Sequence, residues 1–451
     1  MSLANADFDN ITAIATPYGK GSISVIRVSG STCIQEVAKI FKGKDLNKVP
    51  GNTLIYGFIL DKSNQPIDEV VVAVFRKPHS FTTDDMLEIS CHGGVLVTNL
   101  VLNRLLSLNI RMANPGEFSY RAYLNGRIDL VKAEAVMDLI DADTKSAAKI
   151  SINSLLNETG KKISEFKTQV LALISDIEVK LQYPEFDEAK DLETQDLKNR
   201  IEQILMQLKS FLKNSKSTTM LKSGISVAIV GRPNVGKSSL LNSLLKQEKA
   251  LVTEIKGTTR DIVEGKIVLN NIALNLLDTA GIHASTDQIE ELGIKKSLQA
   301  IDSADLVLFV FEAHTKLTKE DLEILTKIQP DKLIKIANKK DLGIFEKHSD
   351  VVYISTFETE FKVLEDAILT KLKLTDIDTR DLAFLSNQRQ IRLLEKTIFE
   401  LTEAFESVDF VTADLVVLNI KAAYSAIKEI LGEVYDDDVN KNIFSHFCLG
   451  K

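Results

Sequence analysis

The sequence lacks any apolar run long enough to cross a bilayer, and its first ten residues are acidic with no apolar core. These absences exclude a membrane-spanning helix and predict a chain without a secretory signal. Only three cysteines are present, Cys33, Cys91 and Cys448, and they lie too far apart for a metal-binding spacing. A cysteine-based zinc cluster is therefore excluded, and the expected location is a reducing cytoplasm with no membrane partner.

Charge and composition are ordinary. Apolar residues make up 44% and charged residues 26% of the chain, as in typical folded proteins. The net charge of −8 argues against a surface coated everywhere by nucleic acid, but it leaves room for a local basic site. At 451 residues the chain is too long for one hydrophobic core, and about three domains are expected.

The most informative segment is residues 231–238, which read Gly-Arg-Pro-Asn-Val-Gly-Lys-Ser. An apolar run at 225–230 precedes it and a helical pattern at 239–245 follows, so the segment is predicted to turn between a strand and a helix. Its glycines let backbone N–H groups face a phosphate, Lys237 reaches the β- and γ-phosphate oxygens, and Ser238 offers a hydroxyl to Mg²⁺. The alternative interpretation is a glycine-rich turn that arose by chance, and two further motifs argue against it.

The second motif, Asp-Thr-Ala-Gly at 278–281, follows a predicted strand at 272–277. Asp278 can hold Mg²⁺ through a water and the Gly281 N–H can contact a γ-phosphate, so the segment is predicted to respond to the nucleotide state. Alone this motif is a common turn, but its place after the phosphate loop makes it a strong signal.

The third motif, Asn-Lys-Lys-Asp at 338–341, follows a predicted strand at 333–338 and selects the base. The carboxylate of Asp341 can accept hydrogen bonds from the N1–H and the 2-amino group of guanine, which adenine lacks. A site built around such pairs can reject the wrong base by roughly 10⁴–10⁵. GTP is therefore the predicted ligand. Ser355 is expected near the base, although such domains often have Ser-Ala where this chain has Ser-Thr.

The motifs leave the hydrolytic residues open. Residues 257–261 (Gly-Thr-Thr-Arg-Asp) occupy the position of a first switch, where either Thr259 or Thr258 could supply a second hydroxyl to Mg²⁺. Ile282 stands where many small GTPases have a glutamine that orients the attacking water, which an isoleucine cannot do. Hydrolysis therefore needs another group to orient water and a positive charge in place of an arginine finger. The candidates are Asp287, Glu290, Glu291 and a bound cation.

The order of the elements predicts a multidomain α/β protein. Alternating strands and helices at 224–375 predict an inserted Ras-like P-loop GTPase domain, a mostly parallel sheet with helices on both faces. β-Branched and aromatic runs within 1–118 predict an N-terminal α+β domain. Helical spacing at 119–223 and at 376–451 predicts an all-helical domain whose two parts pack on each other. Two separate helical units are the alternative. The strands expected in the N-terminal domain are 22–28, 53–59, 69–75 and 86–90.

Several segments outside the phosphate loop are far more specific than GTPase motifs. They are 15–22 (Ala-Thr-Pro-Tyr-Gly-Lys-Gly-Ser), 25–30 (Val-Ile-Arg-Val-Ser-Gly), 91–94 (Cys-His-Gly-Gly), 114–119 (Asn-Pro-Gly-Glu-Phe-Ser), 129–134 (Asp-Leu-Val-Lys-Ala-Glu) and 442–451 (Asn-Ile-Phe-Ser-His-Phe-Cys-Leu-Gly-Lys). With the inserted GTPase module they make the chain resemble, over essentially its whole length, the tRNA-modification GTPase family known as MnmE or TrmE.

The resemblance implies roles for residues of the GTPase domain. Asn234 matches a potassium-binding asparagine, and backbone carbonyls of the loop 253–258 would complete a K⁺ cage near the transferred phosphate. Glu290 matches a catalytic glutamate that orients water; the alternative is a carboxylate that serves a helix dipole. The expected metal ligands are Ser238 and Thr259 for Mg²⁺, and Asn234, Thr253, Ile255 and Thr258 for K⁺. The expected GTP contacts are Asn234, Val235, Gly236, Lys237, Ser238, Ser239, Thr253, Glu254, Ile255, Lys256, Gly257, Thr258, Thr259, Asp278, Thr279, Ala280, Gly281, Asn338, Lys339, Asp341 and Ser355.

The resemblance also implies a folate site in the N-terminal domain. Arg27, Glu88, Arg127 and Lys451 match positions that contact 5,10-methylenetetrahydrofolate or a related tetrahydrofolate. Without the resemblance, Arg27 on an alternating strand is most simply a surface residue. The C-terminal tail would bring Cys448 toward the folate, where it either takes part in the chemistry or remains a buried thiol.

The function implied is potassium-dependent GTP hydrolysis coupled to tRNA modification. With the flavoprotein partner MnmG, the family modifies C5 of the wobble uridine of certain tRNAs to (carboxymethyl)aminomethyluridine with a folate one-carbon unit. Hydrolysis would move paired GTPase domains, and a homodimer formed through the N-terminal domains is expected. Two rival hypotheses are a ribosome-assembly GTPase, which would need an RNA-binding module, and a nucleotide-gated scaffold that needs no turnover.

Overall fold

The computed structural model describes residues 9–182, 194–245, 263–269, 272–277, 300–356, 362–372, 383–434, 443–447 and 450. The chain divides into two compact units that are interleaved in sequence. The first unit consists of Met1–Met137, Leu155–Leu192 and Ser407–Lys451, and the second of Asp138–Ser154 and Glu193–Glu406.

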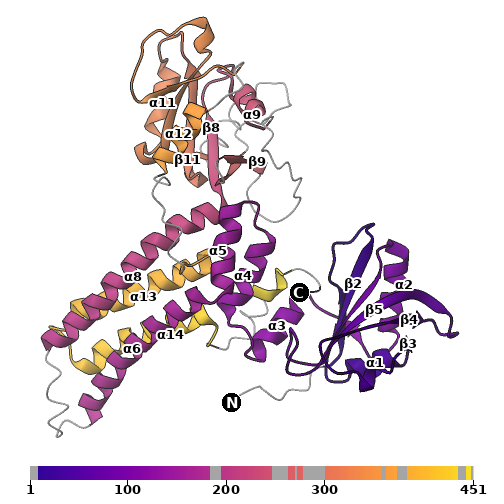
Figure 1. Ribbon diagram of the computed structural model, residues 1–451. Helices are drawn as coiled ribbons and strands as arrows, with labels where there is room; N and C mark the ends of the chain where they lie inside the picture. Colours follow the sequence, from indigo (N-terminus) through magenta and orange to yellow (C-terminus); the bar gives the residue numbers. More distant parts are fainter. Residues whose placement is uncertain are drawn as a thin grey trace, which may run out of the picture. The chain divides into compact units, whose positions relative to one another are not determined.

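The N-terminal part of the first unit is a seven-stranded sheet in the order β3-β4-β5-β6-β2-β1-β7 (Figure 1). Only the β1–β7 pair is parallel among its described pairings. Its strands are β1 (Ile11–Ile14), β2 (Ile23–Ser29), β3 (Phe41–Gly43), β4 (Thr53–Leu60), β5 (Pro66–Phe75), β6 (Met86–His92) and β7 (Arg111–Met112). Helices α1 (Cys33–Ala38) and α2 (Val95–Leu106) cover one face and share its buried core.

The alternation of residues along β2 explains which face is buried. Ile26 and Val28 are fully buried in the core under the helices, and Arg27 between them points to the opposite face, as a strand period of two requires. The expected N-terminal α+β fold and its four strands are confirmed. The sequence reading missed β1, β3 and β7, and the last two are only three and two residues long.

The first unit also contains the helices α3 (Glu117–Leu124), α4 (Leu130–Ile140), α6 (Glu158–Gln182) and α14 (Ala413–Leu431). α6 and α14 pack against each other, one from before and one from after the inserted domain. The buried residues of α6 include those that the helical period predicts, Ile163, Phe166, Val170, Leu173 and Ile177. α14 ends at Gly432, whose φ of 75° is the left-handed conformation that glycine adopts at helix ends.

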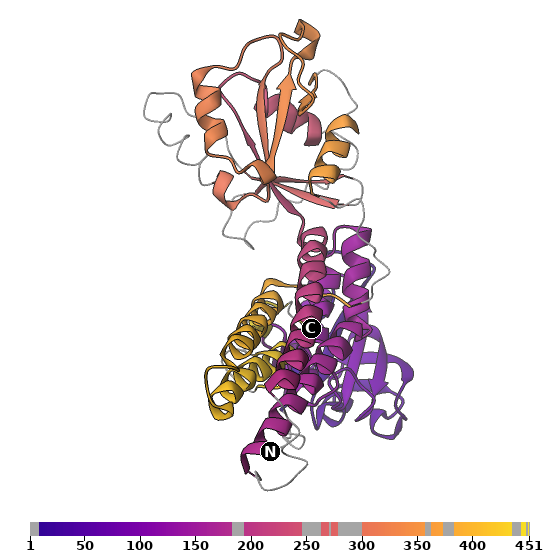
Figure 2. The same cartoon turned by 90° about the vertical axis from the view of Figure 1, so that its left-hand side faces the viewer.

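The second unit contains a six-stranded sheet in the order β13-β12-β11-β8-β10-β9, parallel except for the β10–β9 pair at one edge. Its strands are β8 (Ile225–Val230), β9 (Val263–Leu269), β10 (Ile272–Leu277), β11 (Leu306–Glu312), β12 (Leu333–Asn338) and β13 (Val351–Tyr353). Figure 2 shows helices on both faces: α9 (Lys237–Leu245) and α12 (Lys362–Lys371) share one core, and α11 (Lys319–Thr326) packs on the other. The predicted mostly parallel sheet with helices on both faces is therefore confirmed.

The remaining helices of the second unit are α5 (Lys145–Leu155), α8 (Thr194–Ser223) and α13 (Gln388–Ser407). Ile150 of α5 lies in the same buried cluster as strands β8 and β10, and Lys266 of β9 pairs with Asp143 just before α5. α8 and α13 are joined by an ion pair of 2.6 Å between Lys216 Nζ and Glu395 Oε1. Helices from before and after the inserted sheet thus pack together within each unit, while the domain bounds at 118, 223 and 375 remain predictions.

Three short 3₁₀ helices complete the described secondary structure: η1 (Leu46–Lys48), η2 (Pro330–Lys332) and η3 (Lys340–Leu342). Among the described helices, none combines the length and the apolar composition that a membrane crossing requires.

Candidate functional site

The loop between β8 and α9 has the backbone shape that its glycines and asparagine predict. Asn234 has a φ of 64° and Gly236 a φ of 98°, both in the left-handed region. A Cβ added to Gly236 would overlap the side-chain amide of Asn338, so only glycine leaves room for that amide against the loop. The loop then enters α9, where the Leu240 N–H donates to the Gly236 carbonyl at 2.9 Å.

Lys237 lies across the inside of this loop. Its Nζ donates to the carbonyl oxygens of Gly231 and Arg232, both at 2.7 Å. Burial lowers its pKa from the usual 10.5. Ser238 and Ser239 follow in the first turn of α9 and are exposed. The arrangement presents one fixed ammonium and two hydroxyls at a helix N-terminus, which is a chemistry suited to a phosphate chain.

Asn338, at the end of β12, joins the phosphate loop to the predicted base motif. Its side chain is buried, and its Nδ2 donates to the Val235 carbonyl at 3.0 Å. Its Oδ1 is buried and has no hydrogen-bond partner among the described residues. One end of this amide therefore holds the loop, and the other end is left for a group outside the described chain.

Lys339 and Asp341 complete the motif. Lys339 has a φ of 61°, and its Nζ donates to the Asn234 carbonyl at 3.0 Å and pairs with Glu312. Asp341 Oδ1 accepts a hydrogen bond of 2.6 Å from Ser355 Oγ. The structure thus brings Asn234, Val235 and Gly236 together with Asn338 and Lys339, and it places Ser355 beside Asp341. The role of Ser355 near the base remains a prediction.

The sequence reading missed two carboxylates beside this site. Glu312, at the end of β11, pairs with Lys339, and this hydrogen bond lowers the pKa of Glu312 below the usual 4.5. Asp321, in the first turn of α11, binds Arg232 of the phosphate loop. The spacing Thr318-x-x-Asp321 could have indicated a helix cap, but no local signal indicates a partner so far away in sequence.

Some predicted site residues lie outside the described residues. They are Thr253, Glu254, Ile255, Lys256, Gly257, Thr258, Thr259, Asp278, Thr279, Ala280, Gly281, Ile282, Asp287, Glu290, Glu291, Cys448 and Lys451. The roles assigned to them remain predictions.

A second cluster, in the first unit, surrounds Arg27. Its β2 position lies directly opposite Glu88 of β6, and Arg27 Nη2 and Nε lie 2.7 Å and 3.0 Å from Glu88 Oε1. Arg27 Nη1 donates to the carbonyl of Gly450 at 3.1 Å. The Arg27 side chain is only 16% exposed, so the interpretation of Arg27 as a simple surface residue is wrong.

Aromatic rings flank this ion pair. The Arg27 guanidinium carbon lies 5.3 Å from the centroid of the Phe81 ring and 5.6 Å from that of Phe118. Arg127 lies 5.0 Å from the Phe81 centroid and donates to the Phe81 carbonyl at 3.0 Å. Arg27, Arg127 and Glu88 are therefore brought together around Phe81. Such a set of cations, carboxylate and aromatic ring can bind a flat, polar, anionic molecule.

The chain end reaches this cluster because residues 443–447 are docked nearby in the first unit. Phe444 and Phe447 are buried against Leu130 and Ala133, and the rings of Tyr120 and Tyr123 lie against Phe444. Gly116 approaches so closely that a Cβ there would overlap the Phe444 carbonyl. The family resemblance implied that the tail enters this region, but not the aromatic contacts that hold residues 443–447.

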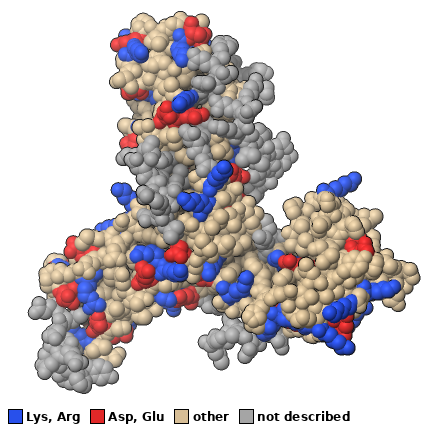
Figure 3. Space-filling view, viewed as in Figure 1, with Lys and Arg blue, Asp and Glu red and all other residues tan. Residues whose placement is uncertain are grey.

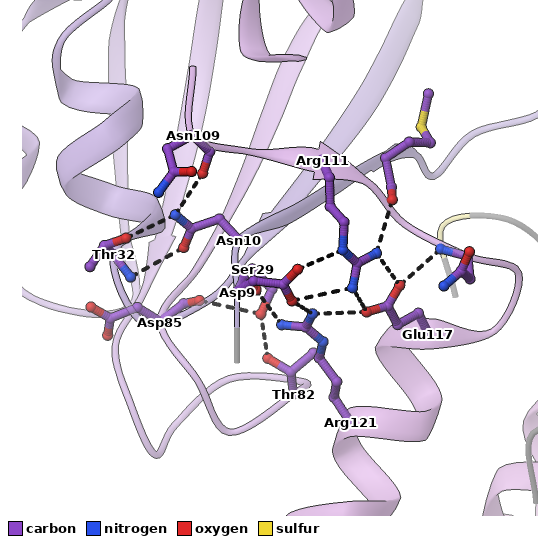
Figure 4. Close-up of polar contacts among 12 residues, drawn as sticks. Asp9, Asn10, Ser29, Thr32, Thr82, Asp85, Asn109, Arg111, Glu117 and Arg121 are labelled. Carbon is purple, nitrogen blue, oxygen red and sulfur yellow. Dashed lines mark hydrogen bonds and ion pairs between the residues drawn. The ribbon is translucent and has the colours of Figure 1, made fainter. Parts of the chain in front are cut away.

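A charge network around the buried Arg121 fixes the start of α3 beside the same sheet (Figure 4). Arg121, 1% exposed, donates to the backbone and carboxylate of Asp9 and, at 2.8 Å, to Glu117. Arg111 binds the same two carboxylates, with Nη2 2.6 Å from Glu117 Oε1. Although burial alone would raise it, hydrogen bonding, first from Arg111, lowers the pKa of Glu117 to about 2.

Comparison with known proteins identifies relatives over the whole chain. A family described as MnmE helical domain matches residues 130–448, and one described as GTP-binding protein TrmE N-terminus matches residues 10–127. The tRNA modification GTPase MnmE of Acholeplasma laidlawii (strain PG-8A) is 45% identical over 446 residues, 98% of this chain and 100% of the relative. That of Aster yellows witches'-broom phytoplasma (strain AYWB) is 41% identical over 460 residues, with coverages of 98% and 100%. Among solved structures, the G domain of the T. maritima FeoB iron transporter aligns at 26% identity with a TM-score of 0.24, covering 33% of this chain and 97% of that one.

Proposed function

This chain belongs to the MnmE family of tRNA modification GTPases, and we propose that its inserted domain binds GTP with Mg²⁺ and hydrolyses it in the service of tRNA modification. One observation carries this proposal: the phosphate loop and the base motif are hydrogen-bonded to each other, through Asn338 to Val235 and through Lys339 to Asn234. A single frame then holds both ends of a nucleotide, with Lys237 for the phosphates and Asp341 for the base. Family membership also favours this function over a ribosome-assembly GTPase.

Guanine selection is proposed for Asp341. The Ser355 hydroxyl orients its carboxylate at 2.6 Å, and a carboxylate can accept both guanine N–H donors. An amide at this position would turn one acceptor into a donor. Asp341→Asn should therefore lower GTP affinity by about 10²-fold, the effect of losing hydrogen bonds to a charged group. Ser355→Ala is the milder variant: it removes the hydroxyl that orients Asp341 but keeps both acceptor oxygens, so it should lower GTP affinity less than Asp341→Asn and keep guanine preference. Equal affinity of the wild-type protein for GTP and ATP would contradict the proposal.

For hydrolysis we propose that Ser238 and Thr259 bind Mg²⁺, and that Asn234, Thr253, Ile255 and Thr258 bind K⁺. K⁺ would supply positive charge near the transferred phosphate, and Glu290 would orient the water. Asn234 is exposed in the loop and therefore accessible to an ion. The test is GTP turnover in K⁺ and in Na⁺ for wild type and Glu290→Ala. Turnover that ignores both the ion and the substitution would contradict these assignments.

In the first unit we propose a site for 5,10-methylenetetrahydrofolate or a related folate at Arg27, Glu88 and Arg127, with Lys451 at the chain end. The cations suit the folate carboxylates, the carboxylate suits the pterin N–H donors, and the Phe81 ring offers a surface for stacking. Arg27→Ala should weaken folate binding at least about tenfold, because it removes an ion pair partner at a partly buried position. Unchanged affinity in a calorimetric titration would remove Arg27 from the site.

Beyond this site we propose that the folate supplies a one-carbon unit for C5 of the tRNA wobble uridine, together with the flavoprotein MnmG, giving a (carboxymethyl)aminomethyl group. The contact between Arg27 and Gly450 supports a place for Cys448 near the folate. The exposed Lys42 lies in the edge strand β3, and the exposed Lys39, Lys44 and Lys48 lie near it in the sequence. Figure 3 shows basic side chains gathered over α1 and β3. They offer a contact for tRNA phosphates.

A homodimer through the N-terminal sheet is also proposed. On the face away from the core, Ile23, Leu54 and Tyr56 are 63%, 71% and 62% exposed. Tyr56 lies beside Val71 of β5, so these two apolar side chains are neighbours on adjoining strands, and β6 separates them from Ile23 of β2. A second copy covering this face would bury it. Analytical ultracentrifugation of Tyr56→Glu should give a monomer where the wild type gives a dimer.

The most direct test of the whole function is nucleoside analysis of tRNA from cells that lack this protein. Loss of the C5-modified wobble uridine, restored by the wild-type chain, is the expected result. An unchanged wobble nucleoside would overturn the proposed function.

A further inference from the structure

The second residue of the phosphate loop is held by a carboxylate from another helix. Arg232 Nε donates to Asp321 Oδ1 at 2.9 Å. The Asp321 side chain is 1% exposed and that of Arg232 is 22% exposed. Because a buried carboxylate without a cation is costly, this contact is strongly favoured over any rotamer of Arg232 that points to solvent.

The carboxylate itself is fixed by the start of α11. Asp321 Oδ2 accepts hydrogen bonds of 2.9 Å from the backbone N–H and from the hydroxyl of Thr318, and Thr318 Oγ1 accepts from the Asp321 N–H at 3.3 Å. This capping box locks the side chain of Asp321 in place. One oxygen serves the helix, and the other is presented to the phosphate loop.

The same stretch of loop also positions Lys237. The carbonyl of Arg232 and that of Gly231 each accept a hydrogen bond of 2.7 Å from Lys237 Nζ. Side-chain anchoring of Arg232 therefore fixes a backbone carbonyl that in turn orients the ammonium aimed at the phosphates. A continuous set of short contacts runs from the cap of α11 to the cation of the phosphate site.

We propose that Asp321 is a positioning residue for GTP hydrolysis, which acts through Arg232 on the placement of Lys237. Its carboxylate contacts Arg232 and Thr318. We expect it to affect the rate of the chemical step more than nucleotide binding. Negative charge on the transferred phosphate grows in the transition state, so a displaced Lys237 ammonium stabilises the transition state less, while GTP binding changes little.

The competing explanation is that Asp321 only caps α11. Three substitutions separate the two roles. Arg232→Gln removes the cation but leaves the capping box intact. Thr318→Ala removes the cap hydroxyl but leaves the ion pair. Asp321→Asn weakens both.

The experiment is steady-state GTP hydrolysis of the full chain, with kcat and KM determined separately, beside thermal unfolding of each variant. We expect Asp321→Asn and Arg232→Gln each to lower kcat about tenfold, because small misplacement of a catalytic group has effects of this size or larger. Their double mutant should be no worse than either single variant, since both break one contact. Arg232→Lys, which keeps a cation, should recover most of kcat. Thr318→Ala should lower the unfolding temperature and leave kcat within about twofold of wild type, because the backbone N–H of residue 318 still holds Asp321 Oδ2 in place.

An unchanged kcat in Arg232→Gln would overturn the proposal, as would additive losses in the double mutant. A fall in kcat for Thr318→Ala equal to that of Asp321→Asn would show that capping alone accounts for the effect. The inference rests on GTP hydrolysis by this chain, and the two fail in different ways: wild type that hydrolyses no GTP contradicts the proposed function, whereas equal rates in wild type and variants contradict only the role of Asp321.

Discussion

Replacing Gly116 by alanine should detach the C-terminal segment 443–447 from the first unit. Gly116 has a φ of 68°, and a Cβ there would lie 2.8 Å from Phe447 Cβ and nearer still to the Phe444 carbonyl oxygen. Gly126 is the matched control, because its φ is 70° and a Cβ there would meet no atom within 4 Å. Alanine pays about 1–2 kcal/mol for the left-handed conformation at either position, so the difference between the variants isolates the contact with the segment.

The size of the effect follows from how weakly a short segment docks. Phe444 and Phe447 are 2% and 7% exposed. Burying two phenylalanine rings contributes about 3–6 kcal/mol. Ordering a segment of this length costs a comparable amount. The net free energy of docking that remains is small, and the cost of an overlap with a backbone carbonyl exceeds it. The segment should therefore leave its place rather than distort α3.

The assay is hydrogen exchange at 443–447, alongside denaturant unfolding. Both variants should lose about 1–2 kcal/mol of unfolding free energy. Only Gly116→Ala should lose protection in the segment. Because Arg27 Nη1 holds Gly450 at 3.1 Å, the loss should also remove the chain end from the proposed folate site. Under the proposed function, tRNA modification then fails while GTP hydrolysis is kept. Equal exchange at 443–447 in the two variants would refute the reasoning.

Three further predictions concern single positions. Gly236→Ala should lower guanine nucleotide affinity about tenfold or more, because the added Cβ displaces the Asn338 amide and buried polar groups lose their partners. Gly343→Ala is the control: its φ is 108° and a Cβ there would meet open space, so affinity should change much less. Equal losses in the two variants would contradict the contact between Gly236 and Asn338. Since the pKa of Glu117 is lowered from 4.5 to about 2, its contribution to stability is present above pH 4.5 and is lost as the pH falls toward 2. Glu117→Gln should therefore lower the unfolding free energy at pH 7 by about 2 kcal/mol, allowing for solvent screening. The unfolding free energy of this variant, measured in urea, should also depend less on pH as the pH falls from 4.5 toward 2, and an unchanged pH dependence would contradict this. Thr83 has a φ of 65°, a conformation that strains a β-branched residue. Thr83→Gly should therefore raise the unfolding free energy by about 0.5–1 kcal/mol, after the entropy cost of glycine is subtracted. A lower denaturant midpoint for this variant would contradict strain at Thr83.

The parts of the fold that could be predicted are those whose signal is local. The phosphate loop at 231–238 is contiguous, so its glycines and lysine indicate both the turn and the ligand without knowledge of any other segment. The strands β2, β4, β5 and β6 and those of the second sheet follow from runs of β-branched or aromatic residues, whereas β1, a run of four residues, was missed. The short strands β3 and β7 carry no such run, because their place is set by pairing with a neighbour that is already formed.

The partners of charged residues could not be predicted in the same way. Arg27 was expected on the surface unless a family resemblance placed it in a site, yet the sheet sets it opposite Glu88 and the chain end sets Gly450 against it. Arg232 and Asp321 meet only because β8 and β11 are neighbours in the sheet and α11 follows β11. Each of these pairs joins residues that are remote in sequence.

The sequence by itself determined the ligand class, the parallel sheet around the phosphate loop and the family, because motifs and periodicity are properties of short stretches of chain. Only the tertiary structure decided which helices share a core. Segment 138–154 packs on the six-stranded sheet of the second unit through Ile150, whereas α6 packs on α14 in the first unit. A helical period states that one face is buried, but the surface that buries it is chosen by packing of the whole chain.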